Sequence, residues 1–258
     1  MISFTDAAIY TWLGGFLWPL TRILGLISTA PVLSHNSIPI TSKIGLAVIL
    51  SIIISPSLTN IPAVNPASLQ GILILTQQLI IGLAMGFAMR IIFIAVDMAG
   101  TITGMTMGLG FASFFDPQTQ GQTVAISQFL TMITTLVFLS INGHLILIEG
   151  LVESFTTLPL SIPSLNPHGY LQLANWGSAI FSAGVQLAMP MVAALLITNI
   201  ALGILTRSAP QLNLFGIGFP LMLGIGFLVI AVVLPYMATP IQALIQQGFN
   251  FTQQLFHN

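Results

Sequence analysis

The chain carries almost no charge. Four Lys or Arg and five Asp or Glu make nine charged side chains among 258 residues, whereas an ordinary soluble domain is about 25% charged. Nine charges cannot cover a soluble surface of this size, so the sequence predicts an integral membrane protein. With a formal net charge of −1 and no basic run, nothing attracts nucleic acid or anionic lipid headgroups electrostatically. We therefore expect membrane lipid as a partner and no nucleic acid.

Apolar runs separated by Pro, Asn, Ser and Gly clusters predict an all-α fold. A spanning helix needs about 20 mostly apolar residues. Six runs are candidates, namely 7–33, 44–58, 69–96, 123–158, 171–205 and 214–237, and a Gln-rich amphipathic tail comes after them. The fourth is too long for one straight crossing and has Asn142 to His144 in its middle, so we expect a kink or a tight hairpin there. The fifth is interrupted by Pro190, which removes a helix hydrogen bond.

Basic residues in short loops predict the topology, because Lys and Arg favour the cytoplasmic side. With six crossings, the loop that carries Lys43 and the loop that carries Arg207 fall on the same side, and so does Arg90 near the end of the third run. The loops at 59–68 and 159–170 have no Lys or Arg. We expect these two loops and both termini on the opposite side.

Two arginines interrupt apolar runs and are candidate contact residues. An unpaired buried guanidinium is costly, so several carbonyls or a carboxylate should surround it. No carboxylate lies close to Arg22 in the sequence, so we expect its partner far along the chain or on another subunit. Arg90 and Asp97 are seven residues apart, on one helix face about two turns from each other. They either form an extended pair or reach separately to the membrane interface.

Glu149 and Glu153 form an i, i+4 pair of like charges, which repel by a few tenths of a kcal/mol (roughly 0.2–0.5) on an isolated helix. A proton path, a cationic partner or exposure beyond the membrane would each accommodate them. We expect no metal site, because the four histidines show no H-E-x-x-H spacing and the chain has no Cys. No G-x-S-x-G is present either, so the sequence predicts neither an enzyme nor a cofactor.

Two glycine ladders predict close helix packing. The first is Gly82 and Gly86, and the second is Gly100, Gly104 and Gly108. The second ladder runs into Met and Phe side chains and then a break, a pattern typical of a soft apolar constriction that excludes water. A re-entrant core loop without a gate is the alternative. The candidate plug residues are Met105, Met107, Gly108, Gly110, Phe111, Phe114, Phe115, Asp116 and Pro117.

Three stretches of the chain carry a resemblance to a known family. They are GFASFFDPQTQGQTVAISQFL at 110–130, LTRSAPQLNLFGIGFPLMLGIGF at 205–227 and FLWPLTRILGLISTAPVLSHNSIPITSKIGLAVILSIII at 16–54. Together they resemble the FliR family of flagellar type III export-gate proteins, whose virulence-secretion relatives include SctT. The most specific parts are the FDPQ break at 115–118 and an R-x-x-P-Q-x-N turn formed by Arg207, Pro210, Gln211 and Asn213.

The resemblance implies a place in a larger assembly. FliR proteins, one copy each, join several FliP and FliQ subunits in a closed spiral of kinked helical hairpins. Unfolded flagellar subunits pass through its pore. The assembly belongs to the flagellar basal body at the bacterial inner membrane, with much of it on the periplasmic side.

The resemblance also assigns parts of the chain. Residues 1–170, with the plug segment 105–118, would pack like a FliP, and residues 171–258 like a FliQ hairpin. The turn at 206–213 would face the cytoplasm and contact FlhB. Apart from the resemblance, the cost of a guanidinium within an apolar helix predicts that Arg22 and Arg90 serve assembly rather than transport, and Asp97 is a further candidate contact. The residues alone leave an alternative open, a self-contained small-solute transporter with ion coupling at Arg90, Asp97 and Glu149.

Overall fold

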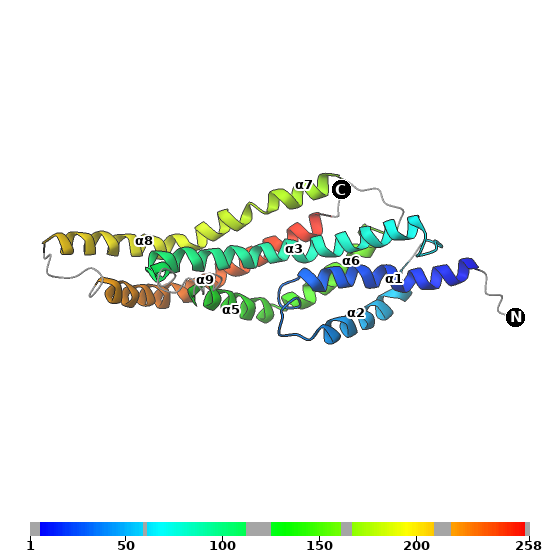
Figure 1. The fold of residues 1–258 in the computed structure, drawn as a ribbon, viewed down its shortest axis with the longest axis horizontal. Helices are drawn as coiled ribbons and strands as arrows, with labels where there is room; N and C mark the ends of the chain where they lie inside the picture. The colour runs from blue at the N-terminus through cyan, green and yellow to red at the C-terminus, as the bar shows by residue number, and fades with distance from the viewer. Residues whose placement is uncertain (1–5, 59–60, 112–124, 161–166, 209–217, 256–258) are drawn as a thin grey trace. The chain divides into compact units, whose positions relative to one another are not determined.

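The computed structural model describes residues 6–58, 61–111, 125–160, 167–208 and 218–255, and within these ranges it is helical with no strand (Figure 1). The all-α prediction is confirmed. The elements in chain order are α1 (Asp6–Thr29), α2 (Ile40–Ile54), η1 (Ser55–Ser57), α3 (Leu69–Thr106), η2 (Leu109–Phe111), α5 (Ala125–Ser140), α6 (Gly143–Thr157), α7 (Pro167–Trp176), α8 (Ala179–Ser208) and α9 (Phe219–Gln254).

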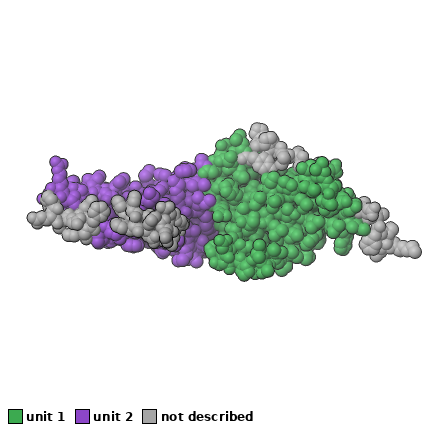
Figure 2. Space-filling model, viewed as in Figure 1, with its two compact units in different colours: residues 1–91, 142–177, 246–258 green, residues 92–141, 178–245 purple. Residues whose placement is uncertain are grey.

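The chain forms two compact units, each assembled from separate pieces of sequence (Figure 2). Unit 1 comprises residues 1–91, 142–177 and 246–258, and unit 2 comprises residues 92–141 and 178–245. The division expected from the family resemblance, between residues 170 and 171, describes likeness to other proteins and not compactness. It stays a prediction.

Four helical stretches of the described residues are long and apolar enough to cross a membrane: Ile40–Ser57, Leu69–Thr106, Leu171–Ser208 and Phe219–Gln254. The bent pair of α5 and α6 makes a fifth if it counts as one crossing. The predicted count of six is therefore not reached, because α1 does not qualify. Arg22, Pro19 and two adjacent glycines lower the mean hydropathy of α1. Four crossings would place both termini on one side and five would not, so the sidedness of the termini stays a prediction.

Two expected helix ends are wrong. The sequence predicts an end of the third run at Asp97, but α3 continues to Thr106 and takes in Gly100 and Gly104. α5 packs against this continuation of α3 at Gly100. Pro190 does not interrupt the fifth run either, since α8 passes through it. The break in that run lies instead at residues 177–178, between α7 and α8.

The fourth run is kinked, as expected, at Asn142. The backbone there is left-handed, with φ 57° and ψ 31°, a conformation that Asn adopts more readily than most residues. The carbonyl of Asn142 accepts bonds from the backbone N–H groups of Leu145 and Ile146, which starts α6. A single residue therefore ends one helical direction and begins the next.

Within unit 1, α1 and α3 approach each other through glycines. A Cβ on Gly82 would collide with the carbonyl of Arg22, and a Cβ on Gly25 would lie 2.7 Å from the carbonyl oxygen of Leu79. The hydroxyl of Thr29 donates to the carbonyl of Leu83 at 3.2 Å between these helices. Gly86 meets the same stretch of α1. The close packing predicted for the first glycine ladder is confirmed.

The end of α9 belongs to the core of unit 1. The ring of Phe251 stacks on that of Trp176 with centroids 4.5 Å apart and planes 7° apart. The indole N–H of Trp176 donates to the carbonyl of Ala88 in α3 at 3.0 Å. Phe249 and Thr252 are buried. Residues 246–255 of the expected amphipathic tail are thus a packed part of this unit.

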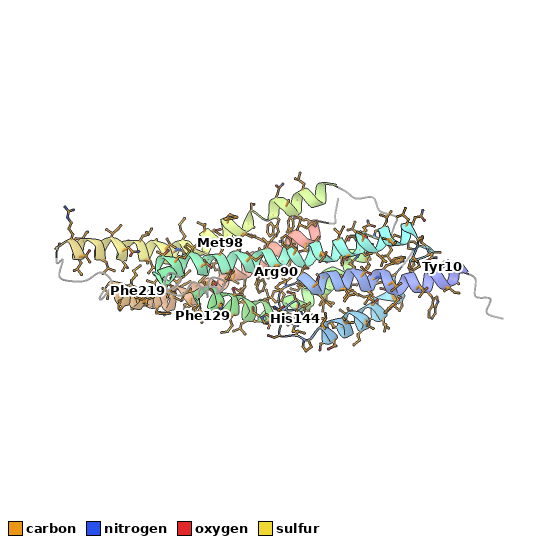
Figure 3. All side chains as sticks on the ribbon, viewed as in Figure 1. Tyr10, Arg90, Met98, Phe129, His144 and Phe219 are labelled. Atoms are coloured by element: carbon orange, nitrogen blue, oxygen red, sulfur yellow. The ribbon has the colours of Figure 1, made fainter. Side chains whose placement is uncertain are left out.

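Unit 2 uses small residues in the same way. A Cβ on Gly100 would collide with the backbone of Ser127 in α5, so the close packing predicted for the second glycine ladder is confirmed at Gly100. Gly184 of α8 lies against Ala95 and Met98 of α3, and Met98 is labelled in Figure 3. Phe93 and Phe138 meet edge to face with ring centroids 5.7 Å apart.

Candidate functional site

The most highly connected polar group in the described chain is the guanidinium of Arg22. Its residue is fully buried, with 0% of its surface exposed. The Nε donates to Oε1 of Gln78 in α3 at 2.7 Å, and Nη1 donates to the carbonyl and the hydroxyl of Ser154 at 2.8 and 3.0 Å. Nη2 donates to the carbonyl of Leu158 at 2.9 Å.

Arg22 therefore caps the C-terminus of α6. The last carbonyls of a helix have no partner within it, and a basic side chain there both bonds them and complements the helix dipole. α6 ends at Thr157 with Leu158 as its cap residue. The ring of Phe155 adds a cation–π contact, with its centroid 4.1 Å from the guanidinium carbon. One side chain thus ties α1, α3 and α6 together within unit 1.

The expectation for Arg22 is confirmed in its chemical part. We expected several carbonyls or a carboxylate from a distant position or another subunit, and the bonds go to carbonyls 132 and 136 residues away in the same chain. The sequence analysis did not identify Gln78 and Ser154. Gln78 was visible as a polar residue within an apolar run, but no feature of the sequence signals that Ser154 meets α1.

The other predicted charged positions lie apart from this cluster. Arg90 is exposed on α3 (Figure 3) and Asp97 is half-buried. Among the described residues, no Lys or Arg forms an ion pair with an Asp or Glu. Arg90 and Asp97 therefore do not pair directly. Glu149 and Glu153 are exposed on α6. Glu153 accepts one long hydrogen bond from Nε2 of Gln253, at 3.5 Å.

The predicted plug residues that the structure describes do not share one surface. Met105, in the last turn of α3, is 62% exposed, whereas Met107 is fully buried against Gly226 of α9. Gly108 reverses the backbone with φ 90°, and Gly110 and Phe111 lie in η2. Met107 is thus a core residue of unit 2. Phe114, Phe115, Asp116 and Pro117 lie outside the described residues.

The predicted partner turn is described only at its first residues. Arg207 is exposed in the last turn of α8, where a cation complements the helix dipole. The remaining predicted residues of the R-x-x-P-Q-x-N turn, namely Pro210, Gln211 and Asn213, lie outside the described residues. The described part of the chain holds no group of three or more potential metal-ligating side chains.

Helices of membrane length and helix packing through glycine define a polytopic α-helical membrane protein. Comparison with known proteins shows which family within this class the chain belongs to. The family described as bacterial export proteins, family 1, matches residues 13–248, and the chain belongs to this family.

Several relatives of the chain are named flagellar biosynthetic protein FliR. The flagellar biosynthetic protein FliR of Escherichia coli (strain K12) is 42% identical over 252 residues, which cover 97% of this chain and 95% of that protein. FliR of Pectobacterium carotovorum subsp. carotovorum is 38% identical over 250 residues, with the same coverage. FliR of Bacillus subtilis (strain 168) is 28% identical over 246 residues, covering 94% of this chain and 93% of that protein. The predicted resemblance to the FliR family is confirmed.

Proposed function

We propose that this chain is the single FliR-type subunit of a flagellar type III export gate in the bacterial inner membrane. With FliP and FliQ it forms the pore through which unfolded flagellar subunits leave the cell. Its role is to build and seal a passage, not to catalyse a reaction. The family match over residues 13–248 carries this proposal.

The uneven burial of the apolar helices supports a role inside an assembly. In the most apolar window of α3, 67% of the residues are buried within the chain, but the share is 17% for Ile40–Ser57, 28% for Leu171–Ser208 and 22% for Phe219–Gln254. The chain by itself therefore covers one of its membrane-length helices and leaves three largely open. Lipid or the helices of other subunits must cover such surfaces.

Co-purification tests the proposal. The chain, with an affinity tag, is expressed together with the FliP and FliQ of the same bacterium, extracted in mild detergent and isolated through the tag. We expect all three proteins to elute in one complex. A homo-oligomer of this chain alone, with FliP and FliQ in the flow-through, would contradict the proposal and favour the self-contained transporter.

The turn at 206–213 faces the cytoplasm in this proposal and contacts FlhB. The exposed Arg207 supports it, because a guanidinium offers a planar fork of donors to a carboxylate or carbonyl of a partner. The chain has no Cys, so a Ser208→Cys variant carries one thiol. We expect labelling only by reagents that enter the cytoplasm. Labelling from the periplasmic side would refute the topology.

Arg90 and Asp97 are proposed assembly contacts, and the segment 105–118 is proposed to plug the pore. Arg90 is exposed and so is free to meet another subunit. Met105 is exposed and Gly108 adopts positive φ, which supports an apolar segment hinged beside the end of α3. The likeness of 1–170 to FliP and of 171–258 to FliQ belongs to the same proposal.

A further inference from the structure

Asp97 is the one carboxylate among the described residues of unit 2. It lies within the apolar helix α3, where it is half-buried. It forms no hydrogen bond and no ion pair with another described residue. An ionised side chain in an apolar helix is costly unless another group accepts its charge. A ligand, water or another chain must therefore meet this carboxylate.

α5 packs antiparallel to α3 beside Asp97. A Cβ on Gly100 would lie 2.9 Å from the Cβ of Ser127. The rings of Phe93 and Phe138 meet with centroids 5.7 Å apart, so residue numbers rise along α5 as they fall along α3. Residues three and four apart share a helix face. Asp97 therefore lies on the side of α3 that faces α5, about one turn from Gly100 and from Phe93.

Two hydroxyl groups of α5 at this level have no hydrogen-bond partner. Ser127 is fully buried, with 0% of its surface exposed, and Thr131 lies one turn further along α5, level with Asp97. The side-chain oxygens of Ser127 and Thr131 are buried and make no hydrogen bond. By contrast, the hydroxyls of Thr134 and Thr135 donate to carbonyls four residues back in their own helix. Since buried hydroxyls normally have a partner, the oxygens of Ser127 and Thr131 are available to a ligand.

We propose that Asp97, Ser127 and Thr131 bind one monovalent metal cation, sodium or potassium, where α3 and α5 meet in unit 2. A carboxylate and two hydroxyls offer oxygen lone pairs, which are the ligands that hard cations prefer. One carboxylate balances a single positive charge, whereas a divalent cation would leave a net charge in apolar surroundings. A proton on Asp97 would make one hydrogen bond and would leave a hydroxyl without a partner. Water can complete the coordination at the exposed side of Asp97.

The described chain offers no cation of its own at this place. Arg90 is seven residues from Asp97, about 10 Å along α3, and forms no ion pair with it. Arg207 lies in the last turn of α8, whereas α8 contacts α3 beside Asp97 in its first turns, at Gly184. The charge on Asp97 is therefore left for an ion. This inference concerns the chain itself and does not rest on the proposed export-gate function.

A Lys or Arg of another subunit is the alternative occupant. Such a side chain could pair with the half-buried carboxylate. It could reach the hydroxyl of Ser127 only if α5 moved away from Gly100, whereas a small ion requires no such movement. A subunit that meets Asp97 with a carbonyl or a hydroxyl, in the assembly contact proposed for this residue, leaves the ion in place.

Thermal unfolding of the full chain in detergent tests the site. Sodium chloride or potassium chloride replaces choline chloride at constant ionic strength and pH. A ligand that binds only the folded chain stabilises it by mass action. We therefore expect the thermal midpoint to rise with sodium, with potassium or with both, and to level off as the site fills. A midpoint that neither ion changes would overturn the inference.

Substitutions locate the ion. We expect Asp97→Asn to weaken the apparent cation affinity at least about tenfold, and Ser127→Ala and Thr131→Val to weaken it by a smaller factor. Ser127→Ala removes only an oxygen, so the close contact with Gly100 is kept. Thr135→Val is the control and should respond as the unaltered chain does, because this hydroxyl bonds within its own helix. A full response of Asp97→Asn, or equal losses in Thr131→Val and Thr135→Val, would refute the site.

Binding of radioactive sodium or potassium to the purified protein gives a measurement apart from stability. We expect one ion per chain, both in the lone chain and in the complex isolated with FliP and FliQ. Binding to the lone chain but not to the complex would mean that a basic side chain takes the place of the ion, which overturns the inference. A chain that binds the ion but forms no complex contradicts the proposed function and supports this site.

Discussion

At the scale of single residues, Arg22 shows how a chain with nine charges can bury one of them. Removing a guanidinium from water is costly unless its donors are bonded. Here Nε, Nη1 and Nη2 each have an oxygen acceptor, and the positive charge lies at the negative end of the α6 dipole. The acceptors are an amide, a hydroxyl and two helix-end carbonyls. The carbonyls at the end of α6 lack donors within their own helix, so the guanidinium can be buried without a carboxylate partner.

We predict that Arg22→Leu destabilises the folded chain by about 3 kcal/mol or more, because it removes charge-assisted hydrogen bonds and leaves buried carbonyls without donors. The thermal midpoint of the purified protein in detergent measures this. Arg22→Lys should rescue it only in part, since one ammonium cannot reach acceptors on two helices as a planar fork does. The exposed Arg90, changed to Leu, is the control and should shift stability by about 0.5 kcal/mol or less.

The same variant distinguishes folding from assembly. If Arg22→Leu leaves the midpoint unchanged but prevents co-purification with FliP and FliQ, then Arg22 acts at a subunit contact and its intrachain bonds are secondary. If the complex forms normally and only export stops, an assembly role is wrong. The structure favours loss of the chain's own stability first, with loss of the complex as its consequence.

At the scale of elements, glycine decides which helices touch. Gly82 and Gly86 let α3 approach the backbone of α1, and Gly100 lets the same helix approach α5. Close approach brings many weak backbone and side-chain contacts into range. A glycine with open space around it, such as Gly45 in α2, contributes no such contact within the chain. A glycine at a close contact between helices therefore stabilises the fold, whereas a glycine with open space around it only makes its helix less stable.

We predict that Gly82→Ala destabilises the chain by about 2 kcal/mol, because the added methyl group collides with the carbonyl of Arg22 and overpacks the contact. The matched variant Gly45→Ala should stabilise the lone chain by about 0.5–1 kcal/mol, because alanine favours helix and nothing is displaced. Helicity measured by circular dichroism during thermal unfolding checks both. Equal effects of the two substitutions would contradict the close packing of α1 on α3.

At the scale of the whole molecule, a pore wide enough for an unfolded chain must be sealed when idle. Otherwise ions would cross a membrane that holds a proton gradient. Apolar side chains can seal a narrow neck by excluding water. The described end of α3 contributes one exposed methionine, Met105, while Met107 is part of the core. The proposed seal therefore depends on the residues C-terminal to Met107.

We predict that deletion of residues 110–115, with Asp116 and the buried Met107 retained, gives an assembled complex that leaks small ions and slows growth. Met107 is retained because its loss would leave a cavity beside Gly226 and confuse a folding defect with a leak. Membrane conductance with the complex confirmed by co-purification measures this. Unchanged conductance would favour a packed core loop over a seal.

The sequence by itself determined the class of this protein. Scarcity of charge and the length of apolar runs do not depend on where the runs lie in the fold, so the all-α membrane fold could be predicted. So could four of the six membrane-length runs, or five if the bent pair of α5 and α6 counts as one. The glycine spacing and the left-handed turn at Asn142 arise from backbone sterics of single residues. The family resemblance likewise rests on contiguous stretches such as 110–130 and 205–227.

Only the tertiary structure decided which distant residues meet. The acceptors of Arg22 lie up to 136 residues away, and no local pattern ranks Ser154 above other serines. Packing also overrode local signals, because neighbours stabilise α3 beyond Asp97 and α8 continues through Pro190. Met105 and Met107 look alike in sequence, yet one is exposed and the other buried. Hydropathy adds up residue by residue, whereas burial depends on which helix lies alongside, and that is a property of the folded chain.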